Sequence, residues 1–126
     1  MAKKKIIEIE EEFERIDLVT KSEELAVKII YLQKRLLQQK EFTVSPQAVR
    51  SGMAIGAYIA SSQYAENLIE KKQMLHSALK NAAETIYWLK LLRDSEHLDA
   101  AELTGLIKDC NHLINELLLT KEEIQF

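Results

Sequence analysis

The sequence predicts an all-α fold, an antiparallel up-down-up-down bundle of four helices. The first observation is composition: the 126 residues include one proline and three glycines, so few positions break a helix. The second is periodicity, because apolar residues recur every three or four positions in four separate stretches. Short segments join these stretches, and short links favour antiparallel neighbours in a bundle.

The first predicted helix runs from about Ser22 to Lys40, and Thr20 with Glu23 has the spacing of a capping box before it. One face carries four apolar residues: Leu25, Ile29, Leu32 and Leu36. A second row widens this stripe: Ala26, Ile30, Gln33 and Leu37. We therefore expect this helix to touch more than one neighbour.

The second predicted helix begins at Pro46, with Ser45 as its cap. Serine accepts a hydrogen bond from an orphan amide, and proline at the first helical position gives up a donor that would be unpaired. The helix contains a set of small residues: Gly52, Gly56, Ala57 and Ala60. Because each glycine costs about 1 kcal/mol in a helix, we interpret this set as a motif for close helix packing.

The third predicted helix runs from residue 65 or 66 to Arg93, and Tyr87 and Trp88 near its end are interpreted as packing residues. The fourth begins at Asp99, where Glu102 would complete a capping box. Its main apolar stripe is Leu103, Ile107, Cys110, Ile114 and Leu117. A further apolar set exceeds the need of one core, and we expect it to form an interface between copies: Leu106, Leu113, Leu118 and Leu119.

Residues 1–19 are predicted to be an arm outside the bundle domain, which comprises residues 20–126. Three lysines precede a Glu-rich run with irregular apolar spacing, which favours a frayed or partner-docked arm over a fifth helix. No apolar stretch approaches the roughly 20 residues of a membrane-spanning helix, and no signal-peptide pattern follows the lysines. We therefore expect a cytoplasmic protein that does not associate with membranes.

Charged residues suggest two kinds of contact. Arg50 and Glu84 lie among apolar or small residues on the two central helices, which predicts a buried, bidentate ion pair in preference to a ligand-binding role. The candidates for phosphate contact are two basic pairs: Lys34 with Arg35, and Lys71 with Lys72. A solvated face is the simpler interpretation of both pairs, because acids lie nearby and the net charge is −3.

No pattern indicates an enzyme, a cofactor, a metal or a small-molecule substrate. A di-iron bundle needs Glu-x-x-His on two helices, and the chain has no such motif. Asp109 and His112 have ligand-like spacing, but no second helical pair accompanies them. Cys110 lies in an apolar stripe, where a buried thiol is the expected state. Neither a nucleophile elbow nor a glycine-rich phosphate loop is present.

Two segments, VRSGMAIGAYIASSQYAE and SALKNAAETIYWLKLL, resemble the signature stretches of a bacterial four-helix-bundle family. This family is encoded in intervening sequences of 23S ribosomal RNA genes, and the likeness covers roughly residues 25–121. The matching residues are Arg50, Ser51, Ile55, Gly56, Ala57, Ile59, Ala60, Glu84, Thr85, Tyr87, Trp88 and Leu89. The chain departs from the family pattern at Ala54, Tyr58 and Ser61, where the pattern has serine, asparagine and glutamate.

The resemblance implies a homopentamer of four-helix bundles with no established enzymatic activity. A more distant similarity links the chain to the accessory variability protein of diversity-generating retroelements, a strongly basic pentamer that engages nucleic acid. We therefore expect a homo-oligomeric interaction or scaffold protein. The alternative is an RNA- or DNA-associated accessory factor, in which the oligomer gathers scattered basic residues into one patch.

Overall fold

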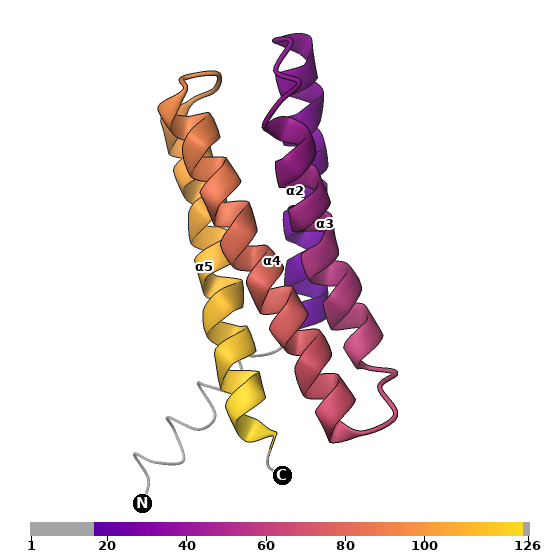
Figure 1. The fold of residues 1–126 in the computed structure, drawn as a ribbon. Helices are drawn as coiled ribbons and strands as arrows, with labels where there is room; N and C mark the ends of the chain where they lie inside the picture. The colour runs from indigo at the N-terminus through magenta and orange to yellow at the C-terminus, as the bar shows by residue number, and fades with distance from the viewer. Residues whose placement is uncertain (1–16, 125–126) are drawn as a thin grey trace, which may run out of the picture.

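The computed structural model describes residues 17–124, which form a bundle of four α-helices without a strand (Figure 1). The helices are α2 (Leu18–Gln38), α3 (Ser45–Ser62), α4 (Leu68–Asp94) and α5 (Ala100–Glu123). Consecutive helices run in opposite directions, and α5 closes the ring against α2. The predicted all-α four-helix fold is confirmed. Most of the predicted arm, residues 1–16, lies outside the described residues.

The predicted apolar stripes form the core of the bundle. All four residues of the first stripe, Leu25, Ile29, Leu32 and Leu36, are buried. Leucines of the other helices meet them, among them Leu75 and Leu89 of α4 and Leu103 and Leu117 of α5. Periodicity predicted this core correctly because burial in a bundle follows the helical repeat. None of the described helices has the length and apolar character that crossing a membrane requires.

Helix α2 begins four residues before the predicted start. Asp17 is its cap, and the Asp17 carboxylate accepts from the Thr20 amide at 3.1 Å. The Thr20 hydroxyl donates to the same carboxylate at 2.6 Å, so Thr20 lies inside the first turn and cannot be the cap. These two bonds lower the pKa of Asp17. The capping-box prediction at Thr20 is therefore wrong by about one turn.

Helix α2 ends two residues before the predicted Lys40, in a motif that usually contains glycine. Lys40 has a φ of 59°, in the left-handed region. The Glu41 amide donates to the Leu36 carbonyl at 2.9 Å, and the Lys40 amide donates to the Leu37 carbonyl at 3.0 Å. This is the hydrogen-bond pattern of a Schellman motif. Sequence reading missed it because a lysine holds the glycine position.

Glu41, a buried residue, organises the start of α3. Its carboxylate accepts from the amides of Thr43, Val44 and Ser45 at 2.7 to 3.0 Å. Burial alone would raise the pKa of Glu41, but these backbone bonds outweigh it and lower the pKa. The Ser45 hydroxyl instead donates to the Glu41 carbonyl, so the predicted serine cap is wrong. The helix starts at Ser45, one residue before the predicted Pro46.

The other two helix starts lie close to their predicted positions. Helix α4 begins at Leu68, two or three residues later than expected, because Asn67 is its cap and accepts from the Glu70 amide. Helix α5 is capped by Asp99 as predicted. Glu102, the expected reciprocal acid, reaches across to Arg35 of α2 instead.

Candidate functional site

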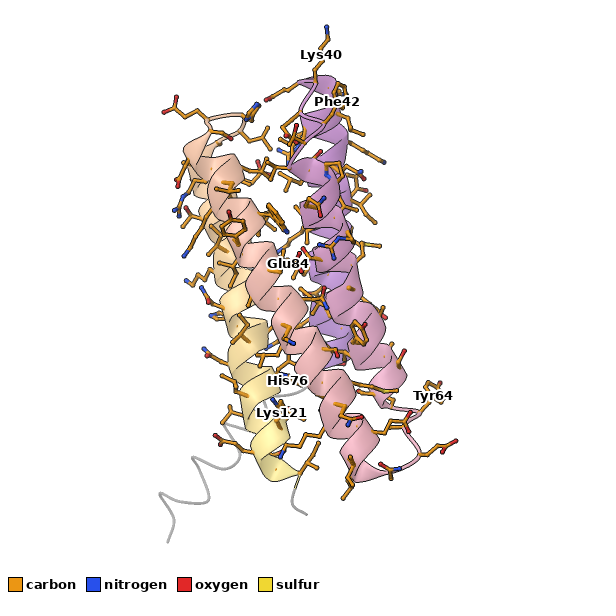
Figure 2. The ribbon with its side chains drawn as sticks, in the orientation of Figure 1. Lys40, Phe42, Tyr64, His76, Glu84 and Lys121 are labelled. Carbon is orange, nitrogen blue, oxygen red and sulfur yellow. The ribbon has the colours of Figure 1, made fainter. Side chains whose placement is uncertain are left out.

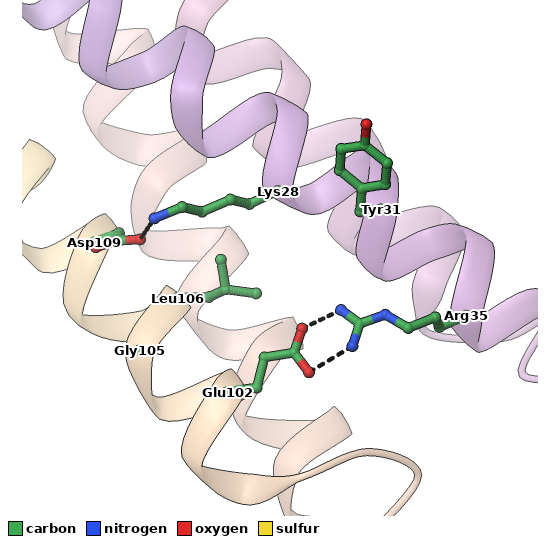
Figure 3. A pocket seen from close by; sticks show the side chains of 7 residues that line it. All are labelled: Lys28, Tyr31, Arg35, Glu102, Gly105, Leu106 and Asp109. Atoms are coloured by element: carbon green, nitrogen blue, oxygen red, sulfur yellow. Dashed lines mark hydrogen bonds and ion pairs between the residues drawn. The ribbon is translucent and has the colours of Figure 1, made fainter.

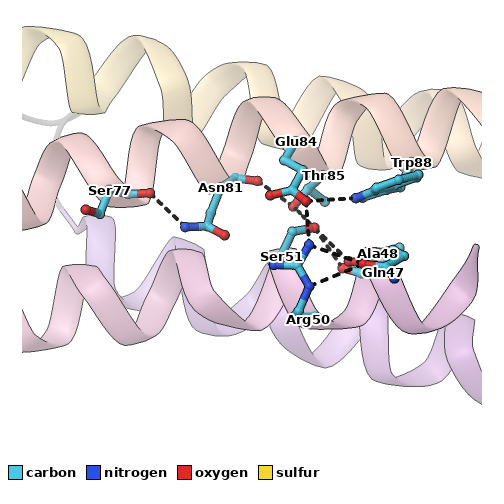
Figure 4. A network of polar contacts seen from close by, with 9 residues as sticks. All are labelled: Gln47, Ala48, Arg50, Ser51, Ser77, Asn81, Glu84, Thr85 and Trp88. Carbon is cyan, nitrogen blue, oxygen red and sulfur yellow. Dashed lines mark hydrogen bonds and ion pairs between the residues drawn. The ribbon is translucent and has the colours of Figure 1, made fainter.

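The seam between α3 and α4 contains a buried pair of hydroxyl groups (Figure 4). Thr85 Oγ1 lies 2.8 Å from Ser51 Oγ, and neither residue is exposed. Ser51 donates to the Gln47 carbonyl at 3.0 Å, which leaves its oxygen to accept from Thr85. The Asn81 carbonyl, 2.7 Å from Thr85 Oγ1, is an alternative acceptor. Because buried polar groups need partners, this pair favours one register of α3 against α4.

The predicted ion pair between Arg50 and Glu84 forms on the outer side of the same seam. Its side chains remain 55% and 37% exposed, so the expectation of a buried pair is wrong. The pair is not bidentate, because only Nη2 of Arg50 meets Glu84 while Gln47 Oε1 accepts from Nε at 3.3 Å. Trp88 Nε1 donates to the same Glu84 oxygen at 3.4 Å. Arg50 is exposed because it lies on the flank of α3, away from the core stripe.

In the small-residue motif of α3, the two glycines and the two alanines have different surroundings. A side-chain carbon at Gly52 would overlap Cδ1 of the buried Ile29, and one at Gly56 would lie 3.2 Å from Ser22 Oγ. These two glycines therefore bring α3 close to α2. The sequence predicted close packing but not which helix would be the partner. Ala57 and Ala60 are exposed, so the expectation that they pack inside the bundle is wrong.

Helices α2 and α5 approach each other less closely than the other neighbouring pairs. Figure 3 shows the side chains along their seam. It contains a groove of about 420 Å³, and the buried Leu106 lies between its two ends. Lys28 Nζ lies 3.0 Å from Asp109 Oδ2 at one end. At the other end Arg35 makes a two-pronged contact with Glu102, with Nη1 at 2.7 Å from Oε2. The groove is therefore bridged by ion pairs, not filled by apolar side chains.

The spacing of these charges follows the helical repeat. Lys21, Lys28 and Arg35 recur every seven residues along α2, and Glu102, Asp109 and Glu116 do so along α5. Lys21 and Glu116 line another hollow farther along the same seam. We call these six residues the charge ladder. Sequence reasoning missed it, although the matched heptad spacing of bases on one helix and acids on another was the available signal.

The four candidates for nucleic-acid contact do not form one patch. Arg35 is engaged by Glu102, and this hydrogen bond raises the pKa of Arg35. The Lys34 ammonium lies 5.3 Å from the centre of the Tyr31 ring. Lys71 and Lys72 are half-buried near the start of α4, at the other end of the bundle (Figure 1). The described residues therefore provide no surface that unites the four.

The four leucines of the predicted oligomer interface on α5 differ in burial. Leu106 and Leu113 are buried within the chain's own core, so assigning them to an interface between copies is wrong. Both leucines face the α2–α5 seam. The apolar pattern of α5 alone does not show which of its apolar residues face another helix of the same chain. Leu118 and Leu119 remain 44% and 43% exposed and are available for contact.

Exposed apolar side chains also occur on α2 and α3. Val27, Ile30 and Leu37 of α2 and Met53 of α3 are exposed, and we call these four residues the α2–α3 face. The close approach of Gly52 to Ile29 brings the next residue of each helix, Met53 and Ile30, to the same level of the seam. The second apolar row of α2 was the sequence feature that could have predicted this exposed face. We instead assigned that row to contacts inside the bundle.

The structure places Cys110 in the core of the bundle and pairs Asp109 with a lysine. Cys110 is fully buried, and burial together with the nearby Asp109 charge raises its pKa to about 12. A thiol in this state is a poor nucleophile, which agrees with the predicted core role. No three metal-ligating side chains converge within residues 17–124. Asp109, the possible partner of His112, binds Lys28 instead.

Comparison with known proteins identifies relatives of the chain. Residues 14–118 match the model of the 23S rRNA-intervening sequence protein family. The fold is similar to the crystal structure of a protein of unknown function from the S23 ribosomal protein family of Bacteroides thetaiotaomicron, with a TM-score of 0.81. The two sequences are 36% identical, and the match covers 83% of this chain and 98% of the other. No curated protein matches the chain.

Proposed function

The chain belongs to the 23S rRNA-intervening sequence protein family, and we propose that it acts as a non-enzymatic, homo-oligomeric interaction or scaffold protein. The observation that carries this proposal is the α2–α3 face. Its four residues are 36% to 50% exposed, although the bundle already has a complete core. Exposed apolar side chains that lie near one another, as the Gly52–Ile29 approach suggests for Met53 and Ile30, are typical of a contact between proteins.

Self-association is the simplest use of the α2–α3 face, because burying apolar surface yields about 25 cal/mol per Å². The pentamer that the family resemblance implies is a closed ring. Such a ring joins two different patches on each copy. Leu119 of α5, which is 43% exposed and lines the same hollow as Lys21 and Glu116, is the candidate for the second patch.

An RNA- or DNA-associated role is the weaker candidate. Nonspecific binding to nucleic acid depends on cations that neutralise phosphates. Arg35 is committed to Glu102, and the lysine pair at the start of α4 lies far from it along the bundle. We therefore do not extend the proposal to nucleic acid.

Light scattering coupled to size-exclusion chromatography tests the proposal over a micromolar concentration range. We expect the wild-type protein to have a mass of several copies. Ile30→Glu, Met53→Glu and Leu119→Glu should each shift it toward the monomer, because each places a charge in an apolar contact. Tyr64→Glu is the control, since Tyr64 is 86% exposed in the α3–α4 loop.

Circular dichroism verifies that each variant keeps its helices. A wild-type monomer at every concentration would refute the proposal. If Leu119→Glu dissociates the assembly while Ile30→Glu and Met53→Glu leave it intact, the interface lies on α5 and the assignment to the α2–α3 face is wrong.

A further inference from the structure

A hollow between α4 and α5 differs in charge from the groove between α2 and α5. Its volume is about 640 Å³, within the range of small-molecule sites. Its lining residues are Ile69, Lys72, Gln73, His76, Ser77 and Lys121. None of these is acidic, although the chain has a net charge of −3. The hollow is therefore a locally basic surface on an acidic protein.

The hollow has hydrogen-bond donors in a defined arrangement. Lys121 Nζ lies 2.7 Å from His76 Nδ1, and Figure 2 shows the two residues on neighbouring stretches of α5 and α4. An ammonium group can only donate, so Nδ1 accepts and the ring proton is on Nε2. This contact leaves the Nε2–H of His76 and further N–H groups of Lys121 to meet an acceptor from outside.

Apolar surface lies beside these donors. Ile69 is 60% exposed, and it has the largest apolar side chain of the lining. Lys72 and Lys121 are half-buried, so part of their methylene stems lies against the helices. One end of the hollow thus suits a negative charge, and the rest suits hydrocarbon.

We propose that this hollow binds a small amphipathic anion, an alkyl carboxylate, with its headgroup on Lys121 and His76 and its chain along Ile69. The combination decides the ligand class. A simple inorganic anion would leave Ile69 unused, and a neutral hydrocarbon would leave the donors unused. In the groove between α2 and α5, Lys28 and Arg35 have acidic partners on α5.

Isothermal titration of the full chain with octanoate tests the proposal, with 1-octanol and acetate as matched probes. 1-Octanol has the chain without the charge, and acetate has the charge without the chain. We expect octanoate to bind at least about tenfold more tightly than either probe. Lys121→Gln should weaken octanoate binding about fivefold to tenfold, since a charge-assisted hydrogen bond is lost. Ile69→Asp should abolish the binding.

Lys28→Gln is the control, because Lys28 lies on a different seam and should leave octanoate binding unchanged. Circular dichroism confirms that the variants fold. Equal affinity for octanoate and 1-octanol, or no effect of Lys121→Gln, would overturn the proposal. Binding to vesicles of anionic lipid without binding to free octanoate would also overturn it, because the ligand would then be a membrane surface.

Discussion

The two seams that α2 makes with its neighbours are built in opposite ways. Against α3, glycines let the backbones approach, and Gly52 leaves just enough room for Ile29. Against α5, long charged side chains bridge a groove of about 420 Å³ (Figure 3). A third glycine, Gly105, lines that groove with open space around it. Close packing therefore requires glycine at the α2–α3 seam, whereas at the α2–α5 seam a larger residue would fit.

This contrast indicates which seam contributes more to the stability of the bundle. A closed apolar seam gains from dispersion and from removal of apolar area from water. An exposed ion pair gains little, because water and salt screen its charges. The α2–α3 seam should therefore respond strongly to mutation and the α2–α5 seam only weakly.

Substitution of Gly52 should have the largest effect on this contrast. Gly52→Val adds a branched side chain where even Cβ overlaps Ile29, whose side chain is enclosed by the core. We expect the free energy of unfolding to fall by about 2–3 kcal/mol, as in other overpacked cores. Urea denaturation followed by circular dichroism measures it.

Gly105→Val is the matched control, because nothing lies within 4 Å of a side-chain carbon there. It should change stability by less than about 0.5 kcal/mol, since valine is a somewhat better helix former than glycine. Equal losses at the two glycines would show that the seams do not differ in packing.

Glu41 should have the second largest effect, because its carboxylate caps the start of α3. Glu41→Gln keeps the shape but removes the charge from three backbone hydrogen bonds, and we expect a loss of about 1–2 kcal/mol at pH 7. The lowered pKa of Glu41 fixes the sign of the pH dependence. Its contribution is complete above the unfolded pKa and disappears as pH falls through the folded value.

The difference between wild type and Glu41→Gln should therefore shrink as pH is lowered from 7 toward 3. Denaturant midpoints at several pH values give this difference directly. A difference that stays constant over this range would mean that the Glu41 carboxylate contributes no charge-dependent stability.

The charge ladder should give the smallest effect. A double-mutant cycle on Lys28→Met and Asp109→Asn should yield a coupling of about 0.5 kcal/mol at physiological salt, because both side chains are more than one-third exposed. The coupling should fall further in 1 M NaCl. A salt-independent coupling above about 2 kcal/mol would instead mark the α2–α5 seam as a tightly closed contact.

Local sequence patterns predicted the helices and most of the core. The stripe from Leu25 to Leu36 and the Asp99 cap were identified correctly, because each depends on residues within a few turns of one helix. The helix ends were less accurate. Lys40 occupies a glycine position, and Glu41 caps α3 from outside the helix, and neither feature follows the usual residue preferences.

The candidate site was predicted less completely. The Arg50–Glu84 pair was identified, but its exposure was not. Leu106 and Leu113 have the same apolar character as Leu119, yet only the first two are buried. Arg35 looked like a basic surface residue and is in fact bound to Glu102, which lies 67 positions away in the sequence. Each of these outcomes depends on how two helices are rotated against each other.

Local patterns in the sequence were sufficient to predict the all-helical class, the first core stripe and a glycine motif for close packing, but not that α2 is the partner of that motif. Those features follow from the period of one helix and from the volume of its side chains. The packed bundle was needed to show that the charge ladder bridges α2 and α5, that the α2–α3 face remains exposed, and that a basic hollow lies between α4 and α5. Helix rotation and register are set by the whole core at once, whereas periodicity along one helix describes only that helix.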